Sequence, residues 1–282
     1  MNPLAPKISR RRFLGGVSFA AIGTLGYARF LEAERVERCQ VTVPLSVGTK
    51  PAVKLLHLSD LHASPVVGLA YIRRAIEMGL EWKPDLICVT GDFVTQQFGD
   101  APGYRDVLRL LPKVAPTFAS LGNHDGGRWS GEDGGYPDVN WIRDVIASTG
   151  IELLHNRSTT IRLAGRELHL VGLGDLWSGE FDAQRGFADR RQGETILLSH
   201  NPDTKDYVGV FDWNLMLSGH THGGQLRVPW LGATPFAPVK DKRFVAGLHS
   251  WNERWIHTTR GIGSVYGMRI NCPPEVSLLT LT

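Results

Sequence analysis

Cysteine is scarce in this sequence of 282 residues, and its placement does not form a disulfide framework. The three cysteines, Cys39, Cys88 and Cys272, lie far apart, and an odd number cannot all be paired within one chain. Cys88 belongs to the apolar run 86–89 and is predicted to be a buried strand residue. A single bridge between Cys39 and Cys272 remains an open alternative.

Excess charge of one sign and long apolar runs are also missing. The net charge of +3 arises in residues 1–28, which carry four basic residues and no acid, so the remainder has a net charge of −1. A nearly neutral body provides no electrostatic surface for nucleic acid, and no nucleic-acid partner is expected. Hydrophobic residues make up 42% and charged residues 21%, which is typical of a globular protein. We expect a monomer without internal repeats.

The N-terminal segment has the order of a secretory signal. Residues 9–14 read Ser-Arg-Arg-Arg-Phe-Leu, and a Gly- and Ala-rich stretch follows at 15–28. This stretch is shorter than the ~20 apolar residues of a bilayer-spanning helix. Residues 1–28 resemble a twin-arginine signal, which predicts the twin-arginine export machinery as a partner. The protein would then be periplasmic, or membrane-anchored and facing outward. The alternative is a basic N-terminal helix on a cytosolic protein.

The rest of the chain is predicted to be a lead-in segment at 29–52 and one α/β domain at 53–282. The first half alternates strands with helices, whereas the second half consists of short strands. This alternation implies a largely parallel sheet covered by helices, and the second half implies a second sheet. The predicted strands are 53–58, 85–90, 117–121, 151–154, 159–163, 167–173, 195–199, 215–218, 225–228, 243–248, 254–258 and 276–281, and the predicted helices are 69–82, 103–111 and 139–148.

Polar residues follow five of these apolar strands directly. The five segments are Asp60-Leu61-His62, Gly91-Asp92, Gly122-Asn123-His124-Asp125, Ser199-His200 and Gly219-His220-Thr221-His222. Each segment alone is also compatible with an ordinary loop, but ligands of α/β proteins bind where strands end, and here five strand ends carry metal-ligand side chains. The mixture of oxygen and nitrogen ligands, without thiolate, favours Mn²⁺, Zn²⁺ or Fe.

The chemistry of the segments predicts distinct roles. Asp60 and His62 share one side of an extended chain and can reach the same ion. The two oxygens of Asp92 can bridge two cations. His124 faces elsewhere than its neighbour Asn123, and Asp125 is expected to orient His124 by accepting a hydrogen bond.

These motifs, in this order, resemble the calcineurin-like metallophosphoesterase superfamily, and within it the exported bacterial phosphodiesterase group of YaeI and YkuE. The resemblance implies a four-layer α/β/β/α sandwich with two mixed sheets and two divalent cations per chain. Asp60, His62 and His222 would hold one cation. Asn123, His200 and His220 would hold the other, and Asp92 would bridge them.

The expected activity is hydrolysis of a phosphodiester, either a small molecule or a lipid. Two cations ~3.5–4 Å apart would clamp the phosphate and activate a water molecule between them. His124 would protonate the leaving alkoxide. Arg260 is a candidate substrate contact, as is the segment 175–177, although Arg260 also fits an ordinary surface arginine. His57 is a candidate to support a ligand by a hydrogen bond.

Two other functions stay open. One is hydrolysis of a lipid-linked pyrophosphate such as UDP-2,3-diacylglucosamine at the membrane. The other is a non-catalytic metal-binding protein. The tryptophans at 230, 251 and 255 fit either a core or a lipid-facing wall.

Overall fold

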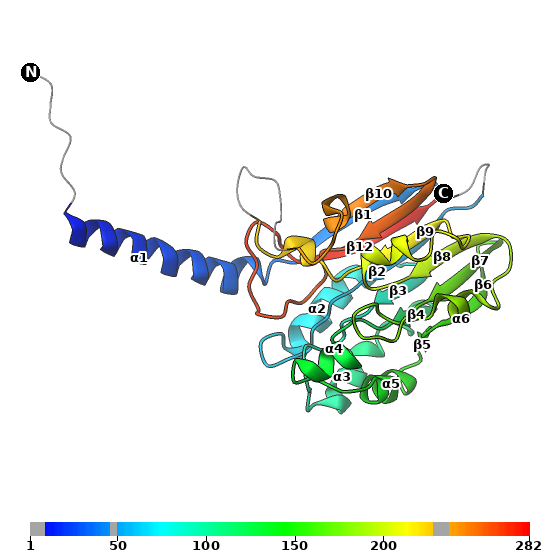
Figure 1. The fold of residues 1–282 in the computed structure, drawn as a ribbon, viewed down its shortest axis with the longest axis horizontal. Helices are drawn as coiled ribbons and strands as arrows, with labels where there is room; N and C mark the ends of the chain where they lie inside the picture. The colour runs from blue at the N-terminus through cyan, green and yellow to red at the C-terminus, as the bar shows by residue number, and fades with distance from the viewer. Residues whose placement is uncertain (1–8, 46–49, 228–236) are drawn as a thin grey trace, which may run out of the picture.

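A computed structural model of the chain describes residues 9–45, 50–227 and 237–282. Helix α1 (Arg10–Tyr27) extends away from the body and continues into the π-helical turn η1 (Ala28–Glu32), which lies against the body (Figure 1). Within the described ranges, no helix combines the length and apolarity needed to cross a bilayer.

The first sheet has the strand order β1-β12-β2-β3-β4-β5. Strands β2 to β5 run parallel to one another, while β12 pairs antiparallel with β2 and parallel with the edge strand β1. Their bounds are β1 (Glu37–Val43), β2 (Val53–Leu58), β3 (Leu86–Thr90), β4 (Thr117–Ser120), β5 (Glu152–Leu153) and β12 (Glu275–Leu281). Every residue of β3 is buried, as expected for a strand covered on both faces.

The second sheet has the order β10-β11-β9-β8-β7-β6. Its central strands β11, β9, β8 and β7 are parallel, and antiparallel strands β10 and β6 close the two edges. The bounds are β6 (Arg157–Leu163), β7 (Arg166–Gly172), β8 (Glu194–Leu198), β9 (Leu215–Ser218), β10 (Gly247–Trp251) and β11 (Arg254–Thr258).

Three apolar clusters separate four layers. One joins the outer face of the first sheet to helices α2 (Leu69–Leu80), α3 (Ala101–Leu108) and α5 (Asn140–Ala147). The second fills the space between the sheets, where Leu55 and Cys88 meet Leu170 and Leu198. The third joins the outer face of the second sheet to α6 (Ala183–Phe187), to the 3₁₀ turn η4 (Lys242–Val245) and to Val208, which follows the 3₁₀ turn η2 (Pro202–Asp206). The α/β/β/α arrangement with two mixed sheets is thereby confirmed.

The structure corrects several of the predicted elements. Residues 37–43, assigned to a lead-in segment, form β1 within the first sheet. Residues 242–245 are the turn η4 rather than the start of a strand, because the Asp241 side chain accepts from the amide of Arg243 and caps the turn. Segment 225–227 makes only an isolated bridge between Leu226 and Ile270, and Val228 lies outside the described residues, as do Trp230 and the remainder of 228–236. All three cysteines are free thiols, so no Cys39–Cys272 bridge forms.

Candidate metal centre

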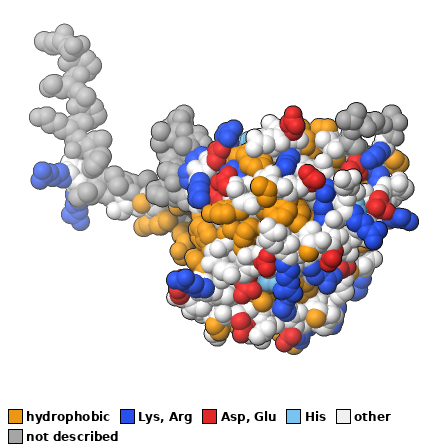
Figure 2. All heavy atoms as spheres, turned by 45° about the vertical axis from the view of Figure 1, so that its right-hand side comes forward, with side chains coloured by type: hydrophobic (Ala, Val, Ile, Leu, Met, Phe, Trp, Pro, Cys, Tyr) orange, Lys and Arg blue, Asp and Glu red, His pale blue; other side chains and the backbone are white. Residues whose placement is uncertain are grey.

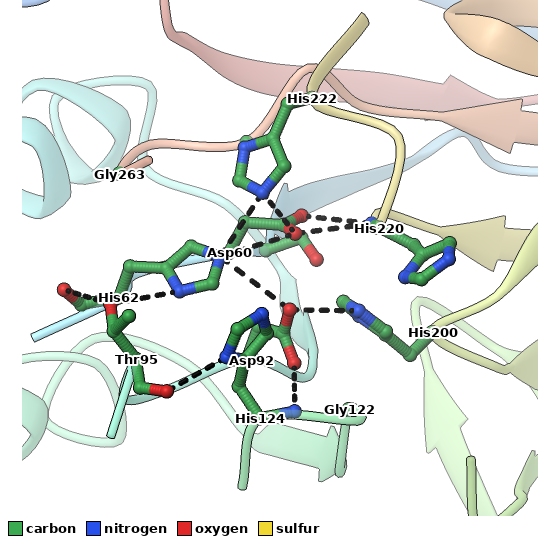
Figure 3. A network of polar contacts seen from close by, with 12 residues as sticks. Asp60, His62, Asp92, Thr95, Gly122, His124, His200, His220, His222 and Gly263 are labelled. Carbon is green, nitrogen blue, oxygen red and sulfur yellow. Dashed lines mark hydrogen bonds and ion pairs between the residues drawn. The ribbon is translucent and has the colours of Figure 1, made fainter. Parts of the chain in front are cut away.

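The five motif segments meet at one edge of the two sheets, where β2, β3, β4, β8 and β9 end (Figure 3). The chain turns sharply at these strand ends, and five non-glycine residues there have φ between 50° and 69°. They are Asp60, His62, Asp92, His220 and His222. This left-handed region is unfavourable for residues with a Cβ, and such strain concentrates at functional sites. All five are predicted metal ligands.

Glycines beside these residues allow the loops to approach one another. A Cβ on Gly122 would overlap the carboxylate and amide of Asp92. A Cβ on Gly219 would overlap Ser59 and the carboxylate of Asp60. These glycines are therefore required by close contact between segments far apart in the sequence.

Asp60, His62, Asp92 and His222 form one buried cluster with ligand atoms all within 4.8 Å of one another. The Nε2 atoms of His62 and His222 face each other at 3.1 Å. His222 Nε2 lies 3.4 Å from Asp60 Oδ1, and His62 Nε2 lies 3.5 Å from Asp92 Oδ2. Ligand atoms held ~2.1 Å from one cation, at right angles, are about 3 Å apart, so this spacing fits a metal site.

A second group of ligand atoms lies on the other side of Asp92. His200 Nε2 lies 3.1 Å from Asp92 Oδ2 without the alignment of a hydrogen bond. His220 Nδ1 lies 2.9 Å from Asn123 Oδ1. His200 Nδ1 donates to the Thr90 carbonyl at 2.7 Å, which fixes its ring and leaves Nε2 directed into the site. The Nε2 atoms of His200 and His220 are buried without a hydrogen-bond partner.

The pKa values of the site histidines show which of them are neutral and ready to bind a cation. Burial lowers the pKa of His62 and of His220 to about 3, so both imidazoles keep a lone pair at neutral pH. Burial also acts to lower the pKa of His200, but the charge of Asp92 outweighs it and raises that pKa well above the ordinary value. Without a cation His200 therefore favours its protonated form beside the Asp92 carboxylate, and a bound cation would take the place of that positive charge.

His124 lies beside the clusters and has its own hydrogen bond. Its Nδ1 donates to the Thr95 carbonyl at 2.7 Å, and its amide donates to Asp92 Oδ1 at 2.9 Å. The expected hydrogen bond from His124 to Asp125 is wrong, because Asp125 accepts instead from the amides of Phe93 and Gly122. Asp125 thus ties the loop after β3 to the loop after β4, and Thr95 orients the imidazole.

Comparison with known proteins identifies this architecture. Residues 53–224 match the family model for calcineurin-like phosphoesterases. The chain is 44% identical over 278 residues to phosphodiesterase YaeI of Escherichia coli, covering 97% of this chain and 99% of that protein.

The chain belongs to the calcineurin-like phosphoesterase family.

Two further relatives cover the same length. The uncharacterized metallophosphoesterase YkuE of Bacillus subtilis is 32% identical over 98% of both chains. The UDP-2,3-diacylglucosamine pyrophosphatase LpxG of Chlamydia trachomatis is 25% identical, covering 92% of this chain and 93% of that protein. This phosphoesterase is a metal-dependent phosphoric ester hydrolase with a buried Asp/His cluster suited to a divalent cation.

A cavity of about 330 Å³ opens onto the two clusters. Its lining includes five residues of the motif segments, which are Asp92, Asn123, His124, His220 and His222. The other lining residues are Trp129, Asp133, Trp177, Thr221, Gly224, Gln225, Leu226, Pro238, Val265 and Tyr266. The ring of Trp129 packs edge-on against His124 at 4.3 Å between centroids, and that of Trp177 packs edge-on against His220 at 4.4 Å. Of the predicted pocket segment 175–177, Trp177 lines this cavity and residues 175 and 176 do not.

Arg260 and His57 do not make the contacts predicted for them. The Arg260 guanidinium binds Glu275 at 2.5 Å and Glu37 at 3.0 Å, and it does not line the cavity. The geometry gives no support to a contact between Arg260 and substrate. His57 contacts Thr90 Oγ1 at 2.8 Å and His257 at 2.9 Å, so it supports His200 only through Thr90.

Arg269 is the functional residue that sequence reasoning missed. It is fully buried, its Nη1 donates to the His222 carbonyl at 2.9 Å, and its Nη2 lies 3.2 Å from His222 Nδ1. Nη2 also donates to the carbonyls of Arg260 and Gly263. The guanidinium therefore fixes the His222 backbone to the loop after β11. No motif in the sequence marks this residue.

Replacing Arg269 by methionine should weaken binding of Mn²⁺ or Zn²⁺ by about 10–100-fold, as expected when a ligand loses the group that orients it. Competition with a chelator measures the affinity. Arg166→Met is the matched control, because Arg166 is also buried but binds Glu194 and the Leu281 carbonyl far from the site. Equal affinities in the two folded variants would contradict the orienting role of Arg269.

Proposed function

We propose that this chain is a phosphodiesterase that uses two divalent cations and a histidine general acid. The observation that carries the proposal is the position of Asp92 between two groups of ligand atoms. Its Oδ2 faces His62 Nε2 on one side and His200 Nε2 on the other. Asp60, His62 and His222 would hold one cation. Asn123, His200 and His220 would hold the second, with Asp92 shared. Mn²⁺, Zn²⁺ and Fe all suit this ligand set.

Bound cations would supply Lewis acidity at the phosphoryl oxygens and lower the pKa of water. The chain supplies the proton for the leaving group. His124 lines the cavity, and its Nδ1 is held by the Thr95 carbonyl, so Nε2 is the atom available to a substrate. Thr95 and Trp129 keep the imidazole in place while the proton is transferred.

The lining of the cavity supports a diester rather than a monoester. Among the described residues, no Lys or Arg lines it, so a second negative charge on the substrate would gain no partner beyond the cations. A diester carries one negative charge and has two organic substituents. The indoles of Trp129 and Trp177, with Leu226 and Val265, offer apolar surface for these substituents. The relative YaeI is named as a phosphodiesterase, which agrees with this substrate class.

Trp177→Ala should raise KM for an aromatic diester such as bis(p-nitrophenyl) phosphate by about 2–10-fold, since an aromatic contact contributes ~0.5–1.5 kcal/mol. The value of kcat should change less, because His124 packs on Trp129 rather than on Trp177, and His220 has a second contact at Asn123. Steady-state kinetics separate the two constants. Trp82→Ala serves as control, because Trp82 packs on Arg38 outside the cavity. An unchanged KM in Trp177→Ala would remove this residue from substrate binding.

The direct test of the proposed function uses purified full-length chain reconstituted with Mn²⁺, Zn²⁺ or Fe²⁺. We expect hydrolysis of bis(p-nitrophenyl) phosphate, and slower hydrolysis of p-nitrophenyl phosphate. A chain that binds the metals yet hydrolyses neither compound would instead support a non-catalytic metal-binding protein. Faster turnover of the monoester would contradict the argument from the cavity lining.

A lipid pyrophosphate is a second candidate substrate. The relative LpxG is named for hydrolysis of UDP-2,3-diacylglucosamine, and it matches this chain over nearly its full length. Including this compound in the substrate panel distinguishes the two candidates, because a pyrophosphatase would release a nucleoside monophosphate.

We further propose export by the twin-arginine route, which rests on the Arg pair at 10–11 followed by Phe13-Leu14. Arg10→Lys with Arg11→Lys should leave the protein in the cytoplasm of a producing bacterium, as measured by cell fractionation. The control is Arg35→Lys with Arg38→Lys, downstream of the signal. Unchanged export of the first double variant would refute the assignment.

A further inference from the structure

The segment that follows α1 is fixed to the loop that orients His222. The Ala28 carbonyl accepts from the amide of Arg269 at 3.1 Å, and Glu32 Oε1 accepts from the amide of Cys272 at 2.6 Å. Ala28 and Glu32 are buried. Between them, Phe30 and Leu31 point outward and are 71% and 63% exposed. The turn η1 therefore belongs to the folded body, yet presents two large apolar side chains to the outside.

Further exposed apolar side chains lie between η1 and the mouth of the metal cavity. Arg29 beside them donates to the carbonyl of Val66, a residue whose side chain is 41% exposed. Gly267 packs against Arg29 and Val66, and its neighbour Tyr266 lines the cavity while remaining 71% exposed. Figure 2 shows hydrophobic side chains gathered on the body beside the base of α1. We call Phe30, Leu31, Val66, Leu226 and Tyr266 the apolar rim.

Isolated exposed apolar residues are common on protein surfaces and need no explanation. Here they are concentrated. Thirteen large hydrophobic side chains are exposed among the described residues, and ten of them lie on α1, on η1 or in the loops after β2, β7, β9 and β11. The other three are Val114, Tyr207 and Val210. Four of the ten lie on α1, which extends away from the body, and the other six lie on η1 or in these loops. This concentration points to a partner that can bury apolar side chains, such as a lipid layer.

The charge of this side indicates which partner. Residues 9–31 contain no acid, and Arg10 and Arg11 are exposed at the start of α1. Arg29 lies within the apolar rim at the other end of the helix. A surface that combines exposed apolar side chains with arginines fits an anionic lipid layer, where the apolar groups enter the acyl boundary and the arginines meet head groups.

We infer that the apolar rim and η1 bind an anionic lipid surface, with the metal cavity opening at the plane of that surface. A phosphoester whose apolar part stays in the lipid could then enter the cavity without leaving the membrane. The inference of lipid binding depends only on the exposed apolar side chains and arginines. The inference of an amphiphilic substrate rests on the proposed phosphodiesterase function.

Sedimentation of the full chain with vesicles tests the inference. Vesicles of phosphatidylcholine with 30% phosphatidylglycerol are compared with phosphatidylcholine alone. We expect preferential binding to the anionic vesicles. Phe30→Ser with Leu31→Ser should lower the partition coefficient by at least about 10-fold, because two large side chains lose their burial. Val114→Ser with Val210→Ser is the matched control, which removes exposed apolar side chains from outside the rim and should bind as the unmodified chain does.

Hydrolysis of bis(p-nitrophenyl) phosphate without vesicles is measured on the same samples. Vesicle binding without hydrolysis would refute the proposed function and leave lipid binding intact. Hydrolysis without vesicle binding, or a Phe30/Leu31 double variant that binds like its control, would overturn the lipid inference. A dimer of the full chain that dissociates in the Phe30/Leu31 double variant would assign the rim to a second copy, which also overturns it.

Discussion

Replacing His124 by alanine is expected to lower kcat on an alkyl phosphodiester by about 10²–10⁴-fold, the usual contribution of a general acid. An alkoxide leaves poorly unless it is protonated as the P–O bond breaks. Nitrophenolate leaves without help, so the same variant should lose much less activity on bis(p-nitrophenyl) phosphate. The ratio of the two losses is the diagnostic quantity, and steady-state kinetics with both substrates measure it.

The geometry makes this prediction specific to His124. Its imidazole lines the cavity and is held at Nδ1 by the Thr95 carbonyl. The other predicted site histidines are assigned as metal ligands, whereas His124 is not. His155→Ala is the control, because His155 contacts Glu180 outside the cavity and should leave both rates unchanged. Equal losses on the two substrates in His124→Ala would show that this residue supports the site without donating a proton.

Replacing Asp92 by asparagine should have the second large effect. The substitution keeps the shape of the side chain but removes its charge and one acceptor oxygen. Because both groups of ligand atoms face this carboxylate, we expect fewer metal ions bound per chain. The loss in kcat should exceed the about 10²–10³-fold expected for one electrostatic contact in an active site. Metal analysis and kinetics on the same sample measure both effects.

Asp203→Asn provides the comparison for Asp92. Asp203 is also buried, but its carboxylate accepts from the Lys240 amide outside the metal cavity. This variant should keep full metal content and activity. An Asp92→Asn protein that retained two ions and normal kcat would show that the two cations do not share Asp92.

The strand-end motifs allowed the centre of the site to be predicted from the sequence. Parallel strands place their carboxyl ends at one edge, so residues following β2, β3 and β4 must meet there. Spacing within a motif could not give the hydrogen bonds between motifs. Asp125 follows His124 directly, yet it turns to the amides of Phe93 and Gly122. The Thr95 carbonyl accepts the hydrogen bond from His124 that was expected for Asp125. A contact to a backbone atom cannot be recognised from the identity of a side chain.

Other features depend on long-range contacts that lack a local pattern. Arg269 reaches His222 across 47 positions of sequence, and nothing near it resembles a ligand motif. Strand β1 was missed because only Val43 of its seven residues is buried, which leaves no apolar run to recognise. It pairs with β12 at the edge of the sheet, where polar residues such as Gln40 are tolerated. The apolar rim likewise joins residues from η1 and three loops.

The central claim is a site for two cations that share Asp92. Its most direct test is the metal content of the purified full chain after reconstitution with Mn²⁺ and removal of free ions, determined by mass spectrometry against protein concentration. We predict two ions per chain. One ion per chain at saturation, or none, would contradict the shared site and with it the mechanism built on Asp92.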